Sequence, residues 1–599
     1  MQPTMEILAR ISKNSFANKE EVFTKLYRYL LRPDLYFVAY KHLYANNGAA
    51  TKGVNNDTAD GFSEAKITKI IESLANETFQ PTPVRRTYIE KKNDPKKKRP
   101  LGIPTFTDKL VQEVLRMVLE AVYEPIFLPV SHGFRPKKSC HTALTSLKKE
   151  FNGARWFVEG DIKGCFDNID HAVLVGLLNN KVKDARIIKL IYKFLKAGYI
   201  EDWQYHKTYS GTPQGGIISP LLANIYLHEL DKFVMKLKTE FDTPKMERRT
   251  QEYNELRVKA AKISRHIAKS NGDERLRLLA EYKATRAQLL KTPCTPQTDR
   301  KIKYIRYADD FIVAVKGSRE DCQWIKSQLS EFIGETLKME LSEEKTLITH
   351  SSEYARFLGY NVRVRRCDVI KRGGPGSVKK RTLNNSCELA IPLDDKIHKF
   401  IFSKGVAIQK QDGTMFPIHR KPLLRLTDLE TVSVYNAELR GICNFYGTGS
   451  NFDKLCYLAY LMEYSCLKTL ANKHKSSISK VIAKFKDGNS KWGVPYETKS
   501  GTKRRYFAEY TECKGASNPT DIVNNLAVVY GYSINSLENR LKAKACELCG
   551  TTESDHYEIH HVNKLKNLKG KQLWEKVMLA KRRKTLVLCR NCHCGIHNQ

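Results

Sequence analysis

The sequence predicts an α+β protein built from several domains, and three observations lead to this prediction. The chain has 599 residues, which is more than one ordinary domain holds. Strand-like and helical patterns are mixed up to about residue 365, and the pattern is then mostly helical as far as residue 485. Cysteine and histidine residues gather near the end of the chain. We therefore expect a large mixed region, a helical domain and a small metal-binding tail.

Lysine and arginine are in large excess over the acidic residues. There are 102 of them against 65 aspartate and glutamate residues, which gives a net charge of +37. Such an excess suits the neutralisation of phosphates, so nucleic acid is the expected partner, and a merely basic soluble protein is the alternative. The hydrophobic content of 41%, with 10% aromatic residues, excludes a mainly disordered chain.

The sequence predicts neither secretion nor membrane insertion. Its first residues lack the apolar run of a secretory signal, and no stretch approaches the ~18 apolar residues of a membrane span. Most of the 15 cysteines are scattered singly, as reduced thiols in a cytosol are. We expect a cytoplasmic protein with no membrane partner.

The first part of the mixed region is expected to be helical and then extended. Residues 20–80 have a polar, helical pattern, and the basic segment 81–104 contains the Pro and Gly residues of a hairpin or an extended loop. A long amphipathic helix follows, with Thr107 or Asp108 as its cap and Pro125 at its end. Its apolar stripe belongs to the core.

Three aspartates stand at the ends of strand-like segments. A short apolar run ends at Asp161, and two β-rich arms, 304–307 and 311–315, flank Asp309 and Asp310 in a hairpin pattern. Buried carboxylates must be paired or bound to metal, so three of them together would hold divalent cations such as two Mg²⁺ ions. The alternative for two adjacent acids at a turn is a solvated turn.

A charged segment separates these acidic strands. After a Gly-rich turn at 211–216 and an apolar helix, residues 232–290 are highly charged, with apolar residues at helical spacing. The sequence at 270–273 would turn the chain back, which predicts a surface helical hairpin. Residues 363–381 are basic and Gly-rich, which is typical of a loop or linker.

Two Cys-x-x-Cys pairs near the end of the chain predict a zinc site. They are Cys546 with Cys549 and Cys589 with Cys592. Four thiolates at this spacing form a closed tetrahedral Zn²⁺ site, which is structural because no ligand position stays open. Cys594 is expected to be a spare thiol.

Six motifs in a fixed order carry a resemblance to a known family. Together they resemble the reverse transcriptases encoded within group II introns, most closely the bacterial LtrA type, and the resemblance extends over essentially the whole chain. The motifs are SHGFRP at 131–136, DIKGCFDNID at 161–170, GTPQGG at 211–216, YADD at 307–310, LSEEKT at 341–346 and FLGY at 357–360.

The resemblance implies a right-hand polymerase followed by further domains. The implied parts are an RNA-binding helical extension (1–80), fingers and palm (81–365) with a charged insert (232–297), a basic linker (366–384), a helical thumb or maturase domain X (385–485), a DNA-binding region (486–540), and an HNH endonuclease domain of ββα-metal fold with the zinc site (541–599).

The resemblance also implies a polymerase site. Asp161, Asp309 and Asp310 match the metal-binding triad, and Lys345 matches a lysine proposed to protonate the leaving pyrophosphate.

Four further residues match nucleotide-binding positions of the family. Phe166 matches the aromatic gate beneath the incoming sugar, where a ring would exclude a ribose hydroxyl. Gln214 matches a contact to the incoming nucleotide, and Arg99 and Lys91 resemble the cations that grip the triphosphate. For any single lysine at 91–98, a solvated contact to the nucleic-acid backbone is the alternative.

The 385–485 segment resembles domain X through residues 437–447 and 465–475. Basic residues on rigid helices suit the backbone of structured RNA, and a plain polymerase thumb is the alternative. The basic residues expected outside the helical core are Arg440, Lys468, Lys473 and Lys475.

The tail resembles an HNH nuclease beyond its zinc site. His561 matches the general base, and His560, His597 and His593 match ligands of a catalytic Mg²⁺ or Mn²⁺. A zinc finger that only binds DNA is the alternative. We expect the tail to share no ligand with the polymerase core. The middle Asn of the signature would fall near Lys584, and the candidates to replace it are Asn563, Asn567 and Asn591.

The 486–540 segment resembles the DNA-binding region of the family. Basic residues at 503–505 lie beside Tyr506 and Phe507, a combination that suits contact with a nucleic-acid backbone together with base stacking.

The resemblance implies a multifunctional enzyme: an RNA-directed DNA polymerase, a maturase that stabilises its own intron RNA, and an HNH endonuclease that nicks the second DNA strand to prime reverse transcription during retrohoming. A splicing cofactor with vestigial enzymatic parts is the alternative, and reverse transcriptases of retrons or diversity-generating elements would explain neither domain X nor the tail. The implied partners are intron RNA, double-stranded target DNA and dNTPs, in a bacterial cytoplasm at the nucleoid, with a homodimer left open.

Overall fold

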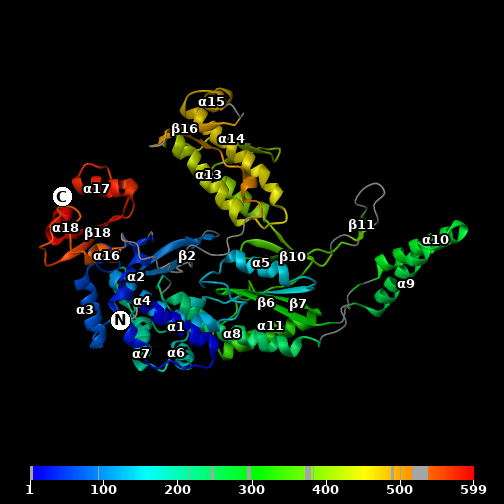
Figure 1. Cartoon of the computed structure of the whole chain (residues 1–599), viewed down its shortest axis with the longest axis horizontal. Coiled ribbons are helices and arrows are strands. Elements are labelled where there is room, and N and C mark those ends of the chain that lie inside the picture. Colours follow the sequence, from blue (N-terminus) through cyan, green and yellow to red (C-terminus); the bar gives the residue numbers. More distant parts are fainter. Residues whose placement is uncertain are drawn as a thin grey trace.

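The computed structural model gathers the chain into a central body, a helical domain above it, a tail domain beside the N-terminal helices, and a projecting pair of helices (Figure 1). It describes residues 4–46, 48–91, 94–212, 215–244, 249–292, 294, 299–367, 369–371, 380–381, 384–487, 491–498, 501–515 and 537–598.

The N-terminal helices pack around one long buried helix, α4. Thr105 caps α4 by accepting a hydrogen bond from the Asp108 backbone N–H at 3.2 Å, so the helix starts before the expected caps at Thr107 or Asp108. The Thr107 N–H is instead bound by the Asp57 carboxylate at 2.7 Å. The helices are α1 (Thr4–Ala17), α2 (Pro33–Tyr44), α3 (Glu64–Ala75) and α4 (Phe106–Tyr123).

The basic segment after α3 forms an antiparallel hairpin at the edge of a four-stranded sheet. The strand order is β2-β1-β4-β5, and β1 is parallel to β4. The Arg86 guanidinium lies 3.6 Å from the centre of the Tyr199 ring, which ties the hairpin to β4. The strands are β1 (Val84–Lys91), β2 (Asp94–Ile103), β4 (Tyr199–Glu201) and β5 (Gln204–His206).

A second four-stranded sheet, in the order β6-β7-β3-β8, forms the centre of the molecule. Gly160 on β3 pairs with Phe311 on β7, and a Cβ atom on Gly160 would lie 2.1 Å from the Phe311 ring, so only glycine fits. Helices α5, α8 and α11 pack on this sheet. The elements are β3 (Trp156–Asp161), β6 (Lys301–Tyr307), β7 (Asp310–Lys316), β8 (Ile348–His350), α5 (Cys140–Glu150), α8 (Ser219–Phe241) and α11 (Arg319–Glu335).

A fully buried ion pair holds the β6–β7 hairpin against α8. Both side chains of the Arg306–Asp231 pair are 0% exposed, with Nη2 and Oδ2 at 2.6 Å and Nε and Oδ1 at 2.7 Å. The guanidinium also donates to the Ser131 hydroxyl at 2.9 Å and to the Ala308 carbonyl at 2.8 Å. Asn224 on α8 donates to the Gly133 carbonyl at 2.8 Å, which fixes the 131–133 loop beneath the hairpin tip.

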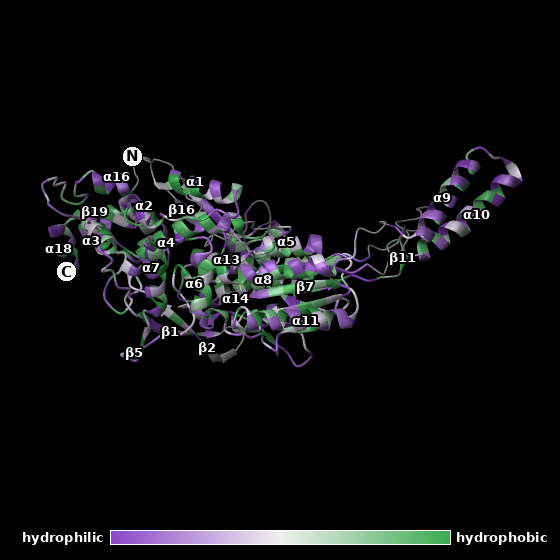
Figure 2. Cartoon of the chain, turned by 90° about the horizontal axis from the view of Figure 1, so that it is seen from below, coloured by the Kyte–Doolittle hydropathy of each residue, from purple (hydrophilic) through white to green (hydrophobic). Residues whose placement is uncertain are grey.

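Helices α9 (Gln251–Ile267) and α10 (Gly272–Lys291) form an antiparallel pair that projects from the body in both views (Figures 1 and 2). Helix α8 runs on to Phe241, because Val234, Leu237 and Phe241 are buried in the core. The projecting pair therefore begins later than the charged insert expected from residue 232.

The helical domain stands on a small three-stranded sheet of order β13-β10-β9. Its two long helices pack on each other, and the Tyr435 hydroxyl on α13 meets the Ser465 hydroxyl on α14 at 2.8 Å. The elements are β9 (Ala355–Phe357), β10 (Tyr360–Val364), β13 (Cys387–Ala390), α13 (Asp428–Phe445), α14 (Leu455–Lys473) and α15 (Ile478–Phe485), followed by the hairpin of β16 (Gly493–Thr498) and β17 (Gly501–Tyr506).

The tail domain packs on the N-terminal helices and shares a continuous core with them. Ile559 on its central strand forms a β-bridge with Phe62, and both side chains are fully buried. This contact has no signal in the sequence, since it joins segments about 500 residues apart. The tail comprises α16 (Leu537–Lys542), β18 (Tyr557–His561), α17 (Leu573–Lys581), β19 (Thr585–Cys589) and α18 (Arg590–His597).

Shorter elements complete the architecture of the described residues. No helix among those residues is both long enough and apolar enough to cross a membrane. The remaining helices and strands are α6 (His171–Asn179), α7 (Ala185–Lys196), β11 (Ile370–Lys371), β12 (Lys380–Arg381), α12 (His398–Ser403), β14 (Ala407–Gln409) and β15 (Met415–Pro417).

Replacing Arg306 by methionine should lower the free energy of unfolding of the central sheet by about 3–5 kcal/mol, because Asp231 would keep its charge in the core without a partner. Urea unfolding followed by tryptophan fluorescence measures this, since Trp156 and Trp324 lie in that layer. The matched control is Arg440→Met, whose partner Glu512 is about half exposed and whose loss should change stability by ~0–1 kcal/mol. Equal effects of the two changes would contradict the role given to Arg306.

Candidate functional site

The three aspartates predicted to bind metal meet at one end of the central sheet. Asp161, at the end of β3, is the register partner of Asp310, the first residue of β7. Asp309 lies in the preceding turn, where Ala308 adopts a left-handed conformation with φ of 55°. Asp161 and Asp310 thus stand at strand ends and Asp309 stands in the turn beside them, so two of the three carboxylates come from one hairpin.

The charges of these carboxylates oppose one another. Burial and the neighbouring Asp309 and Asp161 charges raise the pKa of Asp310 to about 7. Burial, followed by the Asp161 charge, also raises the pKa of Asp309. Acids arranged in this way are stabilised in their ionised form by divalent cations, so the residues present fit a Mg²⁺ site.

Lys345 lies beside the acids, and its Nζ is 2.5 Å from the Asp161 Oδ2. The hydrogen bond to Asp161 raises the pKa of Lys345. The backbone supports this contact, because the Ser342 N–H donates to the Asp161 carbonyl at 2.8 Å. Lys345 therefore reaches the carboxylate end of the sheet as a protonated side chain.

Phe166 packs next to the same end of the sheet. It belongs to the 3₁₀ turn Cys165–Asp167, and its ring meets the Phe134 ring edge to face at 6.1 Å. The start of the Gly-rich loop is fixed here, because the Thr212 N–H donates to the Phe166 carbonyl at 2.7 Å. Gln214, which follows in that loop, lies outside the described residues.

The hairpin of β1 and β2 approaches the acids from the other side. Arg99 on β2 is exposed and pairs in register with Ile89, and its charge acts to lower the pKa of Asp309. Gly215 (φ 107°) packs against this hairpin so closely that a Cβ atom would lie 2.5 Å from the Gly102 carbonyl. Lys91 ends β1, and its side chain lies outside the described residues.

The four tail cysteines form one cluster. The sulfur atoms of Cys546, Cys549, Cys589 and Cys592 all lie within 4.8 Å of one another, with Cys549 and Cys589 at 3.8 Å. Tetrahedral Zn²⁺ with bonds of about 2.3 Å separates its sulfur ligands by about 3.8 Å, so the residues fit zinc. Cys594 is exposed and is not part of this cluster.

A second cluster joins three tail histidines to an aspartate from the N-terminal region. The ligand atoms of His560, His593, His597 and Asp60 lie within 4.8 Å of one another. The Asp60 Oδ2 is 2.7 Å from the His597 Nε2, and its Oδ1 is 3.3 Å from the His593 Nε2. The sequence predicts no ligand from outside the tail, and the spacing of Asp60 carries no signal that could reveal it.

His561 faces away from this cluster. Side chains alternate along β18, so His560 and the following His561 lie on opposite faces of the strand. The His561 Nε2–H donates to the Tyr44 carbonyl at 3.2 Å, and its ring meets the Tyr44 ring edge to face at 6.0 Å. Burial lowers the pKa of His561, which keeps the imidazole neutral.

Three of the four basic residues expected to face RNA on the helical domain have intramolecular partners. Arg440 pairs with Glu512 at 3.0 Å, and Lys473 pairs with Asp428 at 2.6 Å. Lys468 lies 3.4 Å above the centre of the Phe416 ring. Lys475 is exposed at the end of α14.

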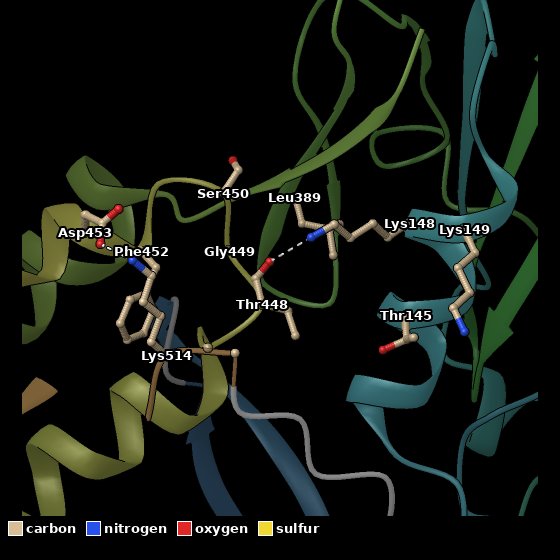
Figure 3. Close-up of a pocket in the computed structure, with 12 residues that line it drawn as sticks. Thr145, Lys148, Lys149, Leu389, Thr448, Gly449, Ser450, Phe452, Asp453 and Lys514 are labelled. Carbon is tan, nitrogen blue, oxygen red and sulfur yellow. Dashed lines mark hydrogen bonds and ion pairs between the residues drawn. The ribbon is translucent and has the colours of Figure 1, made fainter. Parts of the chain in front are cut away.

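A basic pocket of about 670 Å³ lies between α5 and the helical domain (Figure 3). Its lysines come from both sides: Lys148 and Lys149 from α5, and Lys514 from the segment after β17. The Lys148 Nζ donates to the Thr448 carbonyl at 3.5 Å, and Lys514 pairs with Asp453 at 2.9 Å. The pocket has the charge and the open shape that suit a phosphate backbone.

Three family models match successive parts of the chain. A reverse transcriptase (RNA-dependent DNA polymerase) model matches residues 89–254 and 273–362, and a type II intron maturase model matches residues 384–531. An AI2M/AI1M-like HNH endonuclease model matches residues 546–593.

Curated relatives match the chain over different shares of its length. The group II intron-encoded protein LtrA of Lactococcus lactis subsp. cremoris is 66% identical over 99% of both chains. A putative COX1/OXI3 intron 2 protein of Saccharomyces cerevisiae is 31% identical over 98% of this chain and 68% of its own length. The protein YkfC of Escherichia coli is 31% identical over 56% of this chain and 82% of its own length.

Replacing Cys546 or Cys589 by serine should remove about one bound zinc per chain and unfold the tail, because structural zinc supplies folding energy directly. Metal analysis and limited proteolysis of the full chain measure the two effects. The control is Cys594→Ser, which changes an exposed thiol outside the cluster and should retain the zinc. Full zinc content in the Cys546 variant would contradict the four-cysteine assignment.

Proposed function

The chain belongs to the group II intron-encoded proteins, a multifunctional family with reverse transcriptase, maturase and HNH endonuclease domains, and we propose specific roles for its residues on that premise. The single observation that carries the polymerase assignment is the register pairing of Asp161 with Asp310, with Asp309 beside them at the end of one sheet.

Asp161, Asp309 and Asp310 hold the divalent cations of DNA synthesis in this proposal. Mg²⁺, or Mn²⁺ in its place, would lower the pKa of the primer 3′-hydroxyl and stabilise charge on the leaving pyrophosphate. The contribution of the protein itself is to fix two carboxylates on rigid strands and the third in the adjoining turn. Lys345 would donate a proton to the pyrophosphate, and its protonated side chain next to Asp161 supports this role.

The residues around the three aspartates would select and bind the incoming nucleotide. The Phe166 ring is held by Phe134 and by the loop that starts at Thr212, and we assign it to the exclusion of a ribose 2′-hydroxyl. Arg99 and Lys91 on the β1–β2 hairpin would grip the triphosphate. Gln214, in the loop after Thr212, would contact the incoming nucleotide.

The maturase role needs a basic surface on a rigid support. The exposed lysines of α5, the pocket between α5 and the helical domain, and the N-terminal helices supply such surfaces. Structured RNA is bound largely through shape and phosphates, so these surfaces suit the protein's own intron RNA. The chemistry of splicing would then belong to the RNA.

The tail supplies the endonuclease in this proposal. The four cysteines would hold a structural Zn²⁺, and His560, His593 and His597 would hold the catalytic Mg²⁺ or Mn²⁺. His561 is the proposed general base, since it is the neighbour of His560 on β18 and burial lowers the pKa of its imidazole. Target DNA is the substrate, and the nicked strand primes reverse transcription. We place this activity at the bacterial nucleoid, which the net charge of +37 favours.

Asp310→Asn should abolish cDNA synthesis and leave RNA-assisted splicing intact, because the carboxylates serve nucleotidyl transfer while splicing needs only a folded binding surface. Primer extension and intron splicing are measured on one preparation. The control is Glu340→Gln, an exposed carboxylate that pairs with the exposed Lys163. Parallel loss of splicing with unchanged RNA binding would overturn the separation of roles.

Phe166→Val should admit ribonucleotides, because removal of the ring opens space beneath the sugar. One steric clash can contribute several kcal/mol, so the rNTP-to-dNTP ratio of kcat/KM should rise by about two orders of magnitude or more. Single-nucleotide incorporation measures the ratio, and Phe16→Ala, a change of an exposed ring far from the site, is the control. An active Phe166 variant with unchanged selectivity would place the gate elsewhere.

A further inference from the structure

Asp60 is held firmly against the tail domain. The adjacent Gly61 has φ of 74°, and its N–H donates to the Ile559 carbonyl at 3.0 Å. The Ile559 N–H in turn donates to the Phe62 carbonyl at 2.9 Å, so this segment lies along β18 like a short added strand. The buried Phe62 ring stacks on Tyr40 at 4.0 Å. Asp60 thus reaches the histidines from a rigid support.

Three separations among the four side chains equal those between the ligands of one tetrahedral ion, and the Asp60 Oδ2 lies closer, at 2.7 Å, to the His597 Nε2. The Asp60 Oδ1 is 3.3 Å from both the His560 Nδ1 and the His593 Nε2. The His593 and His597 Nε2 atoms are also 3.3 Å apart. A tetrahedral ion with bonds of about 2.0–2.1 Å separates its ligand atoms by about 3.3–3.4 Å. Within the described part of the chain, the buried nitrogens of His560 make no hydrogen bond that would give them another role.

We propose that Asp60 is the fourth ligand of the endonuclease metal and that its carboxylate closes the position that a DNA phosphate must occupy for cleavage. This inference rests on the proposed function, in which His560, His593 and His597 hold that metal. A catalytic metal must keep a position for water or substrate beside its protein ligands, and the Asp60 carboxylate would take one of the positions that three histidines leave free. The tail docked on the N-terminal helices is therefore the resting endonuclease, and cleavage begins with the displacement of Asp60.

The contacts of His561 agree with a resting state. Its Nε2–H is engaged by the Tyr44 carbonyl, and the side chain is buried between β18 and α2. The N-terminal region thus covers both the metal cluster and the proposed base. A DNA phosphate is an anionic oxygen ligand like the Asp60 carboxylate, so it can take the place of the carboxylate in the coordination shell, and the displaced carboxylate turns to solvent.

Metal binding tests the ligand assignment without reference to activity. A set of three imidazoles and one carboxylate suits Co²⁺, Mn²⁺ or Zn²⁺. The full-length protein, with zinc retained at its cysteines, is titrated with Co²⁺ alone and followed by visible absorption. Asp60→Asn keeps the shape of the side chain but removes the charge, and it should raise the Kd for Co²⁺ by at least the 10–100-fold that the loss of an outer-shell partner costs.

Three further variants show whether a change in Co²⁺ affinity comes from the Asp60 carboxylate or from the histidine site as a whole. Asp60→Glu retains a carboxylate and should recover part of the affinity, whereas Asp555→Asn, a change of an exposed carboxylate in the same domain, should bind Co²⁺ as the native chain does. His597→Ala removes a proposed ligand with a half-exposed side chain. Weaker binding in His597→Ala with native binding in Asp60→Asn overturns the role of Asp60 alone. Native binding in both overturns the three-histidine site as well.

The rate of DNA nicking tests whether Asp60 blocks the endonuclease metal in the resting protein. At saturating Mn²⁺, Asp60→Asn should nick a target DNA duplex several-fold faster than the native chain in the absence of intron RNA, because the metal keeps an open position. Primer extension on a pre-annealed primer should be unchanged, which shows that the rest of the chain is folded. Nicking that is slower in Asp60→Asn than in the native chain would mean that Asp60 serves the active state, and the proposed closure would be wrong.

Discussion

The buried Arg306–Asp231 pair fixes the hairpin on which the polymerase site depends. Both side chains are removed from water, so each charge must be matched completely. The guanidinium meets this demand by binding Asp231, Ser131 and the Ala308 carbonyl, and therefore joins α8, the 131–133 loop and the hairpin turn. Ala308 immediately precedes Asp309, so the anchor lies directly behind the acidic tip.

The Arg306–Asp231 pair is important because the like charges of the three aspartates destabilise the hairpin turn. Asp161, Asp309 and Asp310 repel one another, which is why burial and mutual charge raise the pKa of Asp310 to about 7. A flexible turn would relieve the repulsion by moving the acids apart. The β-pairing of Asp161 with Asp310, with Arg306 buried behind the turn, keeps these two carboxylates side by side at the end of the sheet. The stability of the buried core thus holds three carboxylates together although their like charges repel one another.

The parts of the site that could be predicted are those set by short stretches of sequence. Two β-rich arms around Asp309 and Asp310 are enough to indicate a hairpin, and two Cys-x-x-Cys pairs are enough to indicate a metal site. Asp60 could not be found in this way, because its proximity to His593 depends on how two domains pack. The same holds for Lys468, whose position over the Phe416 ring reflects tertiary packing that a count of basic residues does not reveal.

Side chains alternate between the two faces of a β-strand, so neighbouring residues of β18 contact the N-terminal region on opposite faces. His560 and His561 are adjacent in sequence, so they lie on opposite faces of β18, and one reaches the metal cluster while the other reaches Tyr44. Asp60 contacts both histidines of this pair. Its carboxylate lies in the cluster with His560 and also accepts the His561 backbone N–H at 2.7 Å. A movement of the 59–62 segment would therefore release the proposed metal ligands and the proposed base together.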